Sequence, residues 1–559
     1  MSTAALYLPA AFGAAYALRR TYQRLQLSRA KHPSLRGHSR MSRRVARILP
    51  FFEYSPDEAF AVDDAPAEVE GRRRAAFEKL GAELRERAPL TIAASEALGE
   101  GISDVAFTNA YRVPFQFRNL VHRRLPVGQV VSETRGNQVR DLDGNWAYDL
   151  TGSYGVNVFG NDFYKECIEA GVARARDLGP ILGPYHPVIA DNVARLKALS
   201  RLDEVSFHMS GTEAVMQAVR LARYHTRRKY LVRFCGAYHG WWDGVQPGVG
   251  SGRQVSDVYT LKEMDEDSLH VLRTRRDIAC VLVNPLQALH PNGNAPGDAM
   301  LVTSERSASY RREEYGAWLR RLRDVCTERG IVLILDEVFL GFRMAHGGVQ
   351  EYFGVRADMV TYGKTLGGGL PVGVVCGQQD LMRRFRDDRP TDICFARGTF
   401  NSHPYVMTAM NEFLRRLEDP ELRATYDDID ERWDDRAQGL NLALLERGLP
   451  IRFANMLSVW TTLYDQPGAY NWMFQYYLRA EGLLLPWIGS GRFIFSHDYT
   501  EEDFREVARR VVAAAERMQA DGWWWSDPSV TNRSIKKRLM RQLVRAMWQG
   551  RAARQRITH

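Results

Sequence analysis

Paired cysteines are absent from this 559-residue sequence, and long apolar runs are scarce. None of the six cysteines belongs to a Cys-x-x-Cys pair, so neither a zinc site nor a disulfide framework is indicated, and a reducing, cytoplasmic compartment is expected. The apolar run at residues 3–18 is shorter than the ~20 residues that cross a bilayer, and it contains Pro9 and Gly13. It lacks the charge order and the cleavage site of a secretory signal. We expect a membrane-surface anchor or a weak signal anchor here or, alternatively, a helix packed on the body.

Acidic residues are missing from both ends of the chain. Residues 1–50 contain ten Lys and Arg, residues 528–559 contain nine, and neither segment contains Asp or Glu. The rest of the chain is acidic, with 57 basic and 67 acidic residues, so the ends rather than the body call for an anionic partner. Near the C-terminus an apolar stripe at helical spacing is flanked by basic residues and comprises Ile535, Leu539, Met540, Leu543, Val544, Met547 and Trp548.

That stripe predicts a basic amphipathic helix on an anionic membrane surface, with the protein peripheral to the membrane. The alternatives are a helix docked on the protein or its dimer, and a solvated tail. Nucleic acid is the other candidate for basic ends, but no recognition motif accompanies them, so we expect no nucleic-acid partner.

Two charged residues follow apolar strands in the middle of the chain. The run at residues 331–335 ends in Asp336, and the run at 359–362 ends in Gly363 and Lys364, followed by three glycines. In open α/β sheets, ligands bind outside the carboxyl ends of strands. A buried lysine can attack an aldehyde as the neutral amine, and a buried carboxylate suits a cationic partner such as a pyridinium nitrogen. Taken alone, these residues can equally be a surface lysine and a turn-capping aspartate.

The stretch around them resembles the signature of class III aminotransferases, which use pyridoxal phosphate (PLP). An apolar strand, Asp-Glu-Val, Gly-Phe-Arg, Gly-Gly-x-Gln, Thr-x-Gly-Lys and Gly-Gly-Gly-Leu-Pro-Val-Gly occur in order between residues 331 and 373. The resemblance implies an α/β protein of fold type I, with a mostly parallel sheet and a smaller α+β domain. It makes Lys364 the lysine that binds PLP and Asp336 the partner of the pyridine nitrogen.

Other segments extend this resemblance to about residues 107–520. Ser210, Gly211 and Thr212 precede a predicted helix, whose N-terminal N–H groups suit a phosphate. By themselves they can be a simple helix cap; the resemblance makes them the PLP phosphate site. It also implies that Tyr238 stacks on the cofactor, that His239 helps to place it or is only structural, that Gln287 reaches its phenolic oxygen, and that Thr399 reaches the phosphate of a second subunit. A homodimer is therefore expected.

The pocket walls and several departures from the family pattern are also expected from the sequence. Wall candidates are Tyr154, Asn157 and Phe159, with Trp241, Trp242 and Trp487 as an apolar edge. Met209 and Asn284 stand where the family often has Asn and Glu. A structural role is the safer interpretation of Arg112, and residues 288–310 predict a loop near the entrance.

The predicted organisation has five segments. Residues 1–50 are a basic anchor, 51–120 a helical extension, 121–418 the PLP-binding large domain with the first part of the small domain, 419–526 the small domain and 527–559 the basic tail. A hairpin at 130–149 is predicted to turn at Asp143 and Gly144, and Thr500 with Asp503 predicts a capping box.

These features predict a PLP-dependent aminotransferase that binds a small-molecule amino donor and a carbonyl acceptor, with no metal. A lipid-like or acyl-chain carbonyl at a membrane is the hypothesis for the acceptor. The alternative is an isomerase similar to glutamate-1-semialdehyde 2,1-aminomutase; that enzyme has an acidic residue where this chain has Ser490, Gly491 and Arg492. A third possibility is an inactive scaffold of the same fold, against which the intact Lys364 and Asp336 argue.

Overall fold

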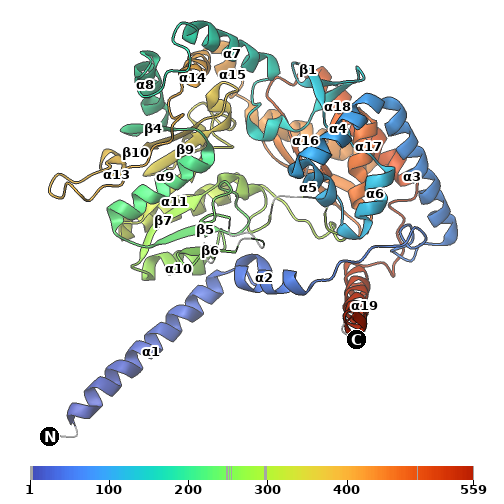
Figure 1. Cartoon of the computed structure of the whole chain (residues 1–559), viewed down its shortest axis with the longest axis horizontal. Helices are drawn as coiled ribbons and strands as arrows, with labels where there is room; N and C mark the ends of the chain where they lie inside the picture. The colour runs from blue at the N-terminus through green and yellow to red at the C-terminus, as the bar shows by residue number, and fades with distance from the viewer. Residues whose placement is uncertain are drawn as a thin grey trace.

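A computed structural model describes residues 4–557 apart from 247–249, 251, 254, 295–296, 298 and 487–488. The main body has two halves (Figure 1). One half is built on a seven-stranded sheet, and the other combines the C-terminal small domain with the helices of the N-terminal extension. Trp487, expected at the edge of the pocket, lies outside the described residues.

The seven-stranded sheet confirms the predicted α/β class with a mostly parallel sheet. Its order is β4-β10-β9-β8-β7-β5-β6, and only β10 runs antiparallel to its neighbours. The strands are β4 (Glu204–His208), β5 (Tyr230–Phe234), β6 (Val258–Leu261), β7 (Ile278–Val283), β8 (Val332–Asp336), β9 (Met359–Gly363) and β10 (Gly373–Gly377). Every residue of β7, β8, β9 and β10 is buried, as uninterrupted apolar runs predict for central strands.

Helices cover this sheet and connect its strands. They are α7 (Asn161–Ala175), α8 (Val188–Ser200), α9 (Gly211–Thr226), α10 (Glu266–Thr274), α11 (Arg312–Arg329), α12 (Gly348–Phe353) and α13 (Gln379–Met382). Helix α9 packs on β9 and β10. It begins at Gly211, shortly after β4 ends at His208, so its N-terminus lies at the carboxyl end of β4. That placement brings the predicted phosphate site to the same edge of the sheet as the ends of β8 and β9.

The second half contains two smaller sheets. β1 (Val131–Arg135), β2 (Gln138–Asp141) and β3 (Trp146–Asp149) form an antiparallel sheet, joined by β13 (Leu483–Leu484) parallel to β3. The turn at Asp143 and Gly144 joins β2 to β3 as predicted, and a further strand precedes it. β11 (Ile451–Met456), β12 (Val459–Tyr464) and β14 (Arg492–Ile494) form the other sheet, with antiparallel pairs.

α14 (Pro404–Arg416) packs on α7 and α8, so it belongs to the half built on the seven-stranded sheet, and α15 (Pro420–Ala424) lies near it in Figure 1. The remaining helices of the second half are α16 (Ile429–Glu446), α17 (Phe474–Ala480) and α18 (Glu501–Ala520). The capping box of α18 is present. Thr500 Oγ1 accepts from the Asp503 N–H at 3.1 Å, and the Asp503 carboxylate accepts from the Thr500 N–H.

The N-terminal extension packs on the small domain. Its helices are α3 (Ala67–Arg87), α4 (Pro89–Gly101), α5 (Ser103–Tyr111) and α6 (Arg118–Arg124), so Pro89 begins a new helix directly after α3. α2 (Ser39–Ile48) precedes the extension and lies near α10 in Figure 1. Arg73 on α3 is fully buried; it donates to both oxygens of Asp63 at 2.8 Å and to the Gly522 carbonyl, also at 2.8 Å. Breaking such a buried pair costs about 3–5 kcal/mol, so this contact fixes the extension to the end of α18.

The two basic ends form helices that project from the lower edge of the molecule in the view of Figure 1. α1 (Ala4–Ala30) meets the body at its last turn, where the Ala30 carbonyl accepts from Lys262 N–H at 2.8 Å. α19 (Asn532–Ile557) is docked through Ile535 and Leu543, which are buried, whereas Met540, Val544 and Trp548 are exposed. The predicted stripe is therefore divided between the protein and solvent, because part of it packs on the body. No described helix is both long and apolar enough to span a membrane.

Candidate active site at the carboxyl ends of β8 and β9

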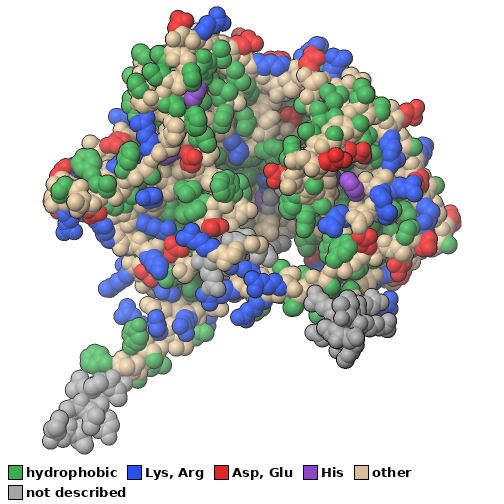
Figure 2. Space-filling view, in the orientation of Figure 1, with side chains coloured by type: hydrophobic (Ala, Val, Ile, Leu, Met, Phe, Trp, Pro, Cys, Tyr) green, Lys and Arg blue, Asp and Glu red, His purple; other side chains and the backbone are tan. Residues whose placement is uncertain are grey.

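Asp336 and Lys364 lie in one cavity of about 770 Å³, as their positions at neighbouring strand ends predict. Asp336 is the last residue of β8, and Lys364 follows the last residue of β9. The cavity opens between the two halves, because its lining also includes Arg492 and Ile494 of β14 in the small domain. The surface in Figure 2 is hollowed between these halves.

Asp336 is a buried carboxylate held by three donors. Its Oδ2 lies 2.7 Å from Nδ1 of His239, and its Oδ1 accepts from the Val338 N–H and the Thr361 hydroxyl, each at 3.2 Å. His239 is also buried, so the contact is screened little by water. A buried carboxylate with fixed orientation can hold a cation above it in the cavity.

Lys364 is enclosed by apolar and glycine-rich neighbours. Burial lowers the pKa of its ammonium, and the negative charge of Asp336 opposes that shift. Its Nζ lies 5.6 Å from the centre of the Phe339 ring. A Cβ on Gly155 would lie 3.2 Å from Lys364 Cδ and 2.7 Å from the Phe339 ring, so only glycine fits against this pair. Lys364 itself has a positive φ of 49°, a backbone strain of the kind that clusters at active sites.

Ser210, Gly211 and Thr212 line the other end of the cavity, at the start of α9. The Ser210 hydroxyl caps the helix by accepting from Glu213 N–H at 3.3 Å. A Cβ on Gly211 would lie 2.7 Å from Val338, and a Cβ on Gly240 would lie 2.4 Å from Thr212 Oγ1. Because no side chain fills the space at these glycines, the backbone N–H groups at the start of α9 and the Thr212 hydroxyl can face a ligand. A phosphate is favoured at such a helix N-terminus.

The loop of Tyr238 and His239 forms another wall. Tyr238 lines the cavity, and its pKa is raised by burial and by the charge of Asp336. Asn284 holds this loop, since its Nδ2 donates to the Tyr238 carbonyl at 2.9 Å while its Oδ1 accepts from Leu286 N–H at 3.1 Å. The family's glutamate is replaced here by a residue that supports the tyrosine backbone. Met209, the other departure, lines the cavity and is half-exposed.

Several predicted site residues lie elsewhere. Gln287 does not line the cavity; its Nε2 donates to the carbonyls of His290 and Gly293. Of the three predicted wall residues only Tyr154 lines it: Asn157 accepts from Gly160 N–H at 2.8 Å, and Phe159 packs on Phe163 and Phe413.

The tryptophan edge predicted for the pocket was wrong for the two described residues. Trp241 is 78% exposed to solvent and Trp242 packs against a core cluster that includes Leu231 of β5, so neither lines the cavity. Thr399 is exposed and is not among the residues that line its own chain's cavity.

Arg492 is a cavity residue that sequence reasoning missed. It is 7% exposed, and burial together with the nearby Arg306 lowers its pKa to about 10. Its Nη2 lies 3.2 Å from Nε2 of His290, and its Nε has no hydrogen-bond partner among the described residues. The segment at 288–310 thus contacts the cavity residue Arg492 through His290, while its Ser304 and Glu305 contact α19. The sequence signal for Arg492 was its place in the segment where the aminomutase has an acidic residue.

Two other motif residues prove structural. Glu337 is buried and accepts from Val349 N–H at 2.7 Å, and burial raises its pKa to about 8. A Cβ on Gly348 would lie 2.2 Å from this carboxylate, which explains the glycine. Arg343 donates to the carbonyls of Phe495 and Asn157, so it ties the small domain and the Tyr154 loop to the main sheet.

The described residues fit PLP. A half-buried lysine suits its aldehyde, the start of α9 suits its phosphate, and the Asp336 carboxylate suits its pyridinium nitrogen. His239 Nε2 is buried without a partner among the described residues, so this end of the cavity retains a polar group for a ligand. No group of acidic, histidine or cysteine residues in the described part of the chain could hold a metal ion.

Comparisons with known proteins agree with this geometry. The family model for class III aminotransferases matches residues 121–494. Glutamate-1-semialdehyde 2,1-aminomutase of Geotalea daltonii is 31% identical over 420 residues, which cover 69% of this chain and 90% of that protein. The enzyme of the same name from Aquifex aeolicus is 28% identical, with 69% and 91% covered.

Solved structures show the same fold. A structure described as a transaminase with PLP bound is 27% identical, covers 71% of this chain and 93% of its own, and has a TM-score of 0.58. A glutamate-1-semialdehyde aminomutase from Pseudomonas aeruginosa is 18% identical, covers 80% and 99%, and has a TM-score of 0.64. The chain belongs to the class III aminotransferases, PLP-dependent enzymes of fold type I.

Proposed function

We propose that this chain moves an amino group on a substrate bound over PLP, with Lys364 and Asp336 as the catalytic residues. The observation that carries the proposal is the convergence of the half-buried lysine, the buried carboxylate and the N-terminus of α9 on one cavity. An inactive scaffold would have no need to keep a lysine in a strained conformation beside such a carboxylate.

PLP, when bound, supplies an electron sink that makes the substrate's α-proton acidic. Lys364 would hold the cofactor and, as a free amine, take and return protons at Nζ; its lowered pKa suits a group that exchanges protons. Asp336, oriented by His239, would hold the pyridinium proton. Ser210, Gly211 and Thr212 would bind the phosphate, and Tyr238 would cover the ring.

Arg492 supports a substrate that carries a carboxylate. Its guanidinium is buried in the cavity, and none of the ion pairs among the described residues involves it. A buried charge is costly unless it is paired. A carboxylate on the substrate would provide the missing partner through charge-assisted hydrogen bonds.

The aminomutase reaction is the first candidate. It rests on the curated relatives, which carry that name at up to 31% identity over about two thirds of this chain. Glutamate-1-semialdehyde also carries a carboxylate that Arg492 could bind. Transfer between two different molecules is the second candidate, because the aminomutase acid is absent from the segment Ser490, Gly491 and Arg492.

A homodimer is proposed because Thr399 is exposed on a segment that does not line its own cavity. In the family resemblance this threonine serves the phosphate of the other subunit. The exposed Phe395 and Phe400 on the same segment are consistent with burial against a partner.

Membrane association is proposed for the two ends. α1 exposes Phe12, Tyr16 and Tyr22, and α19 exposes Met540, Val544 and Trp548 beside basic residues. Both helices project from the same edge in Figure 1, and Lys and Arg side chains gather near the base of α1 in Figure 2. A lipid-like acceptor loses the support of Trp241 and Trp242, and now rests only on this surface and on apolar lining residues such as Leu286 and Phe339.

The first prediction concerns Lys364. PLP loading of the stripped protein requires the neutral amine, so its pH midpoint should lie below that of an ordinary lysine, because burial disfavours the ammonium. Asp336→Asn removes the charge that favours the ammonium and should move the midpoint lower still. The growth of near-visible absorbance measures this, with Lys165→Ala, an exposed lysine, as control. A midpoint that Asp336→Asn leaves unmoved would contradict the assignment, as would PLP bound covalently by Lys364→Ala.

The second prediction separates the two reactions. With glutamate-1-semialdehyde as sole substrate, the PLP-loaded enzyme should form the isomeric amino ketone without consuming an external donor. Chromatography of products and ¹⁵N-labelled donors measures both routes. Product nitrogen taken wholly from an external donor would favour the second candidate, and no amino transfer with any substrate would overturn the proposed function.

The third prediction tests the shared site. Lys364→Ala and Thr399→Ala chains should each be impaired alone, whereas mixed dimers should regain one intact site. The readout is turnover after unfolding and refolding the chains together, compared with each variant refolded separately. A monomeric mass by light scattering, or no recovery in mixed dimers, would count against it.

The fourth prediction tests the ends. Full-length protein should float with anionic vesicles at low salt and be released by high salt, because each Lys or Arg near the surface contributes about 1 kcal/mol and salt screens that attraction. A variant with Phe12, Tyr16 and Trp548 changed to Ser should float less, whereas Leu442→Ser, an exposed residue on α16, should not matter. Equal recovery in the soluble fraction for all proteins would refute membrane binding.

A further inference from the structure

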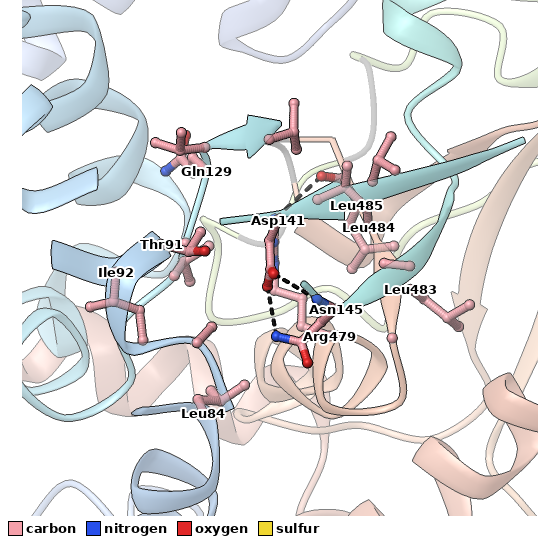
Figure 3. A pocket seen from close by; sticks show the side chains of 18 of the residues that line it. Leu84, Thr91, Ile92, Gln129, Asp141, Asn145, Arg479, Leu483, Leu484 and Leu485 are labelled. Carbon is pink, nitrogen blue, oxygen red and sulfur yellow. Dashed lines mark hydrogen bonds between the residues drawn. The ribbon is translucent and has the colours of Figure 1, made fainter. Parts of the chain in front are cut away.

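A second cavity, which we call the arginine cavity, lies beside the active site between the N-terminal extension and the small domain. Its volume is about 240 Å³. In Figure 3, Leu84, Thr91 and Ile92 from the extension lie on one side and Leu483, Leu484 and Leu485 on the other, with Arg479 and Asp141 between them. Helices α3 and α4, strand β13 and the end of α17 therefore build it together.

Its walls are mostly apolar. They comprise the leucines and isoleucine just named together with Val127, Val130, Val131 and Val139. Such a lining favours an apolar chain or ring, because burying apolar surface is worth about 25 cal/mol per Å². A free inorganic ion would leave these walls unused.

Arg479 introduces a positive charge into this apolar setting. Its Nη2 donates to the Leu485 carbonyl at 3.3 Å, and among the described residues its Nε has no hydrogen-bond partner. Burial and the neighbouring charge of Arg112 lower its pKa to about 9. Arg112 is 2% exposed and lines the same cavity. Two adjacent buried cations repel each other, and an anion between them would relieve that repulsion.

The carboxylate of Asp141, which lines this cavity, is already hydrogen-bonded within the turn between β2 and β3. Among the described residues that line it, only Asp141 carries a carboxylate. Asp141 accepts from the N–H groups of Asp143 and Asn145 at 3.0 and 2.8 Å, and from Asn145 Nδ2 at 2.9 Å. It holds the turn between β2 and β3, and it forms no ion pair with Arg479.

The arginine cavity adjoins the active site. Tyr154 lines both cavities, and the consecutive residues Leu485 and Pro486 line one and the other. Ser153 and Tyr154 both have positive φ angles, 44° and 56°, so the backbone is strained where the cavities meet. Gly155, the next residue, packs on Lys364. A ligand in the arginine cavity would therefore lie close to a substrate over Lys364.

We propose that the arginine cavity binds the far end of the amino substrate, a carboxylate on an apolar chain, with Arg479 as the residue that receives it. This inference rests on the proposed function for the source of the ligand, and on the cavity alone for its chemistry. It assigns a substrate with an amino group or carbonyl at Lys364 and an acid at Arg479. The N-terminal extension then acts in substrate selection, since it supplies one wall.

The test uses octanoate as a probe and octanamide as its neutral match, with full-length PLP-loaded protein in isothermal titration calorimetry. Arg479→Gln should weaken octanoate binding by about 10-fold or more, the effect of a lost charge-assisted hydrogen bond, and leave octanamide binding unchanged. Arg479→Lys should fall between. Arg509→Gln, which alters an exposed pair with Glu506 on α18, should match the wild type. Ile92→Trp, which fills the cavity, should weaken the binding of both octanoate and octanamide. This variant tests the cavity if Arg479→Gln fails to fold.

Octanoate should also raise the KM for amino substrates without changing kcat, since the two ligands meet at Tyr154. Inhibition that leaves KM unchanged would assign the cavity to a separate anionic effector and overturn the substrate role. Equal octanoate affinity in wild type and Arg479→Gln would overturn the anion site itself, even if amino transfer is intact. Octanoate binding that depends on Arg479 in a protein with no amino transfer would instead refute the proposed function and leave the anion site standing.

Discussion

The structure depends on a carboxylate buried at the end of a fully buried strand. Asp336 follows apolar residues of β8 that water does not reach, and its charge is tolerated because His239, Thr361 and the Val338 N–H donate to it. Those donors come from three parts of the chain, so the loop after β5, the strand β9 and the turn after β8 must all be in place together. The same burial lowers the pKa of Lys364 nearby. One desolvated region thus contains both the Asp336 carboxylate and the Lys364 amine.

Close backbone contacts hold this region together. Gly155 approaches Lys364 and Phe339, Gly211 approaches Val338, and Gly240 approaches Thr212, and at each of them a Cβ would lie less than 3.0 Å from a neighbouring side-chain atom. Arg343 adds a polar connection from the main sheet to the small domain through Phe495. The cavity is therefore assembled from segments of both halves, since Arg492 and Ile494 of β14 line a site centred on the large sheet.

Buried arginines distinguish this chain within that common frame. Arg492 in the active-site cavity and Arg479 in the adjoining one both have their pKa lowered by burial, and neither has a carboxylate partner among the described residues. Desolvated cations without acids select anionic ligands. The N-terminal extension and the segment at 288–310 supply neighbours to these arginines through Arg112 and His290.

The sequence alone determined the central strands, the mostly parallel sheet that they form, and the places of Asp336 and Lys364 at strand ends. Uninterrupted apolar runs and the residues that follow them are local signals. It also located the helix start at Ser210, the turn at Gly144 and the cap at Thr500. Tertiary structure decided the rest. Gln287, Asn157 and Trp241 were expected in the pocket, but the direction of a side chain after a loop depends on distant packing. Arg492 and Arg479 emerged only when segments hundreds of residues apart enclosed them, since burial and missing partners are properties of the folded chain.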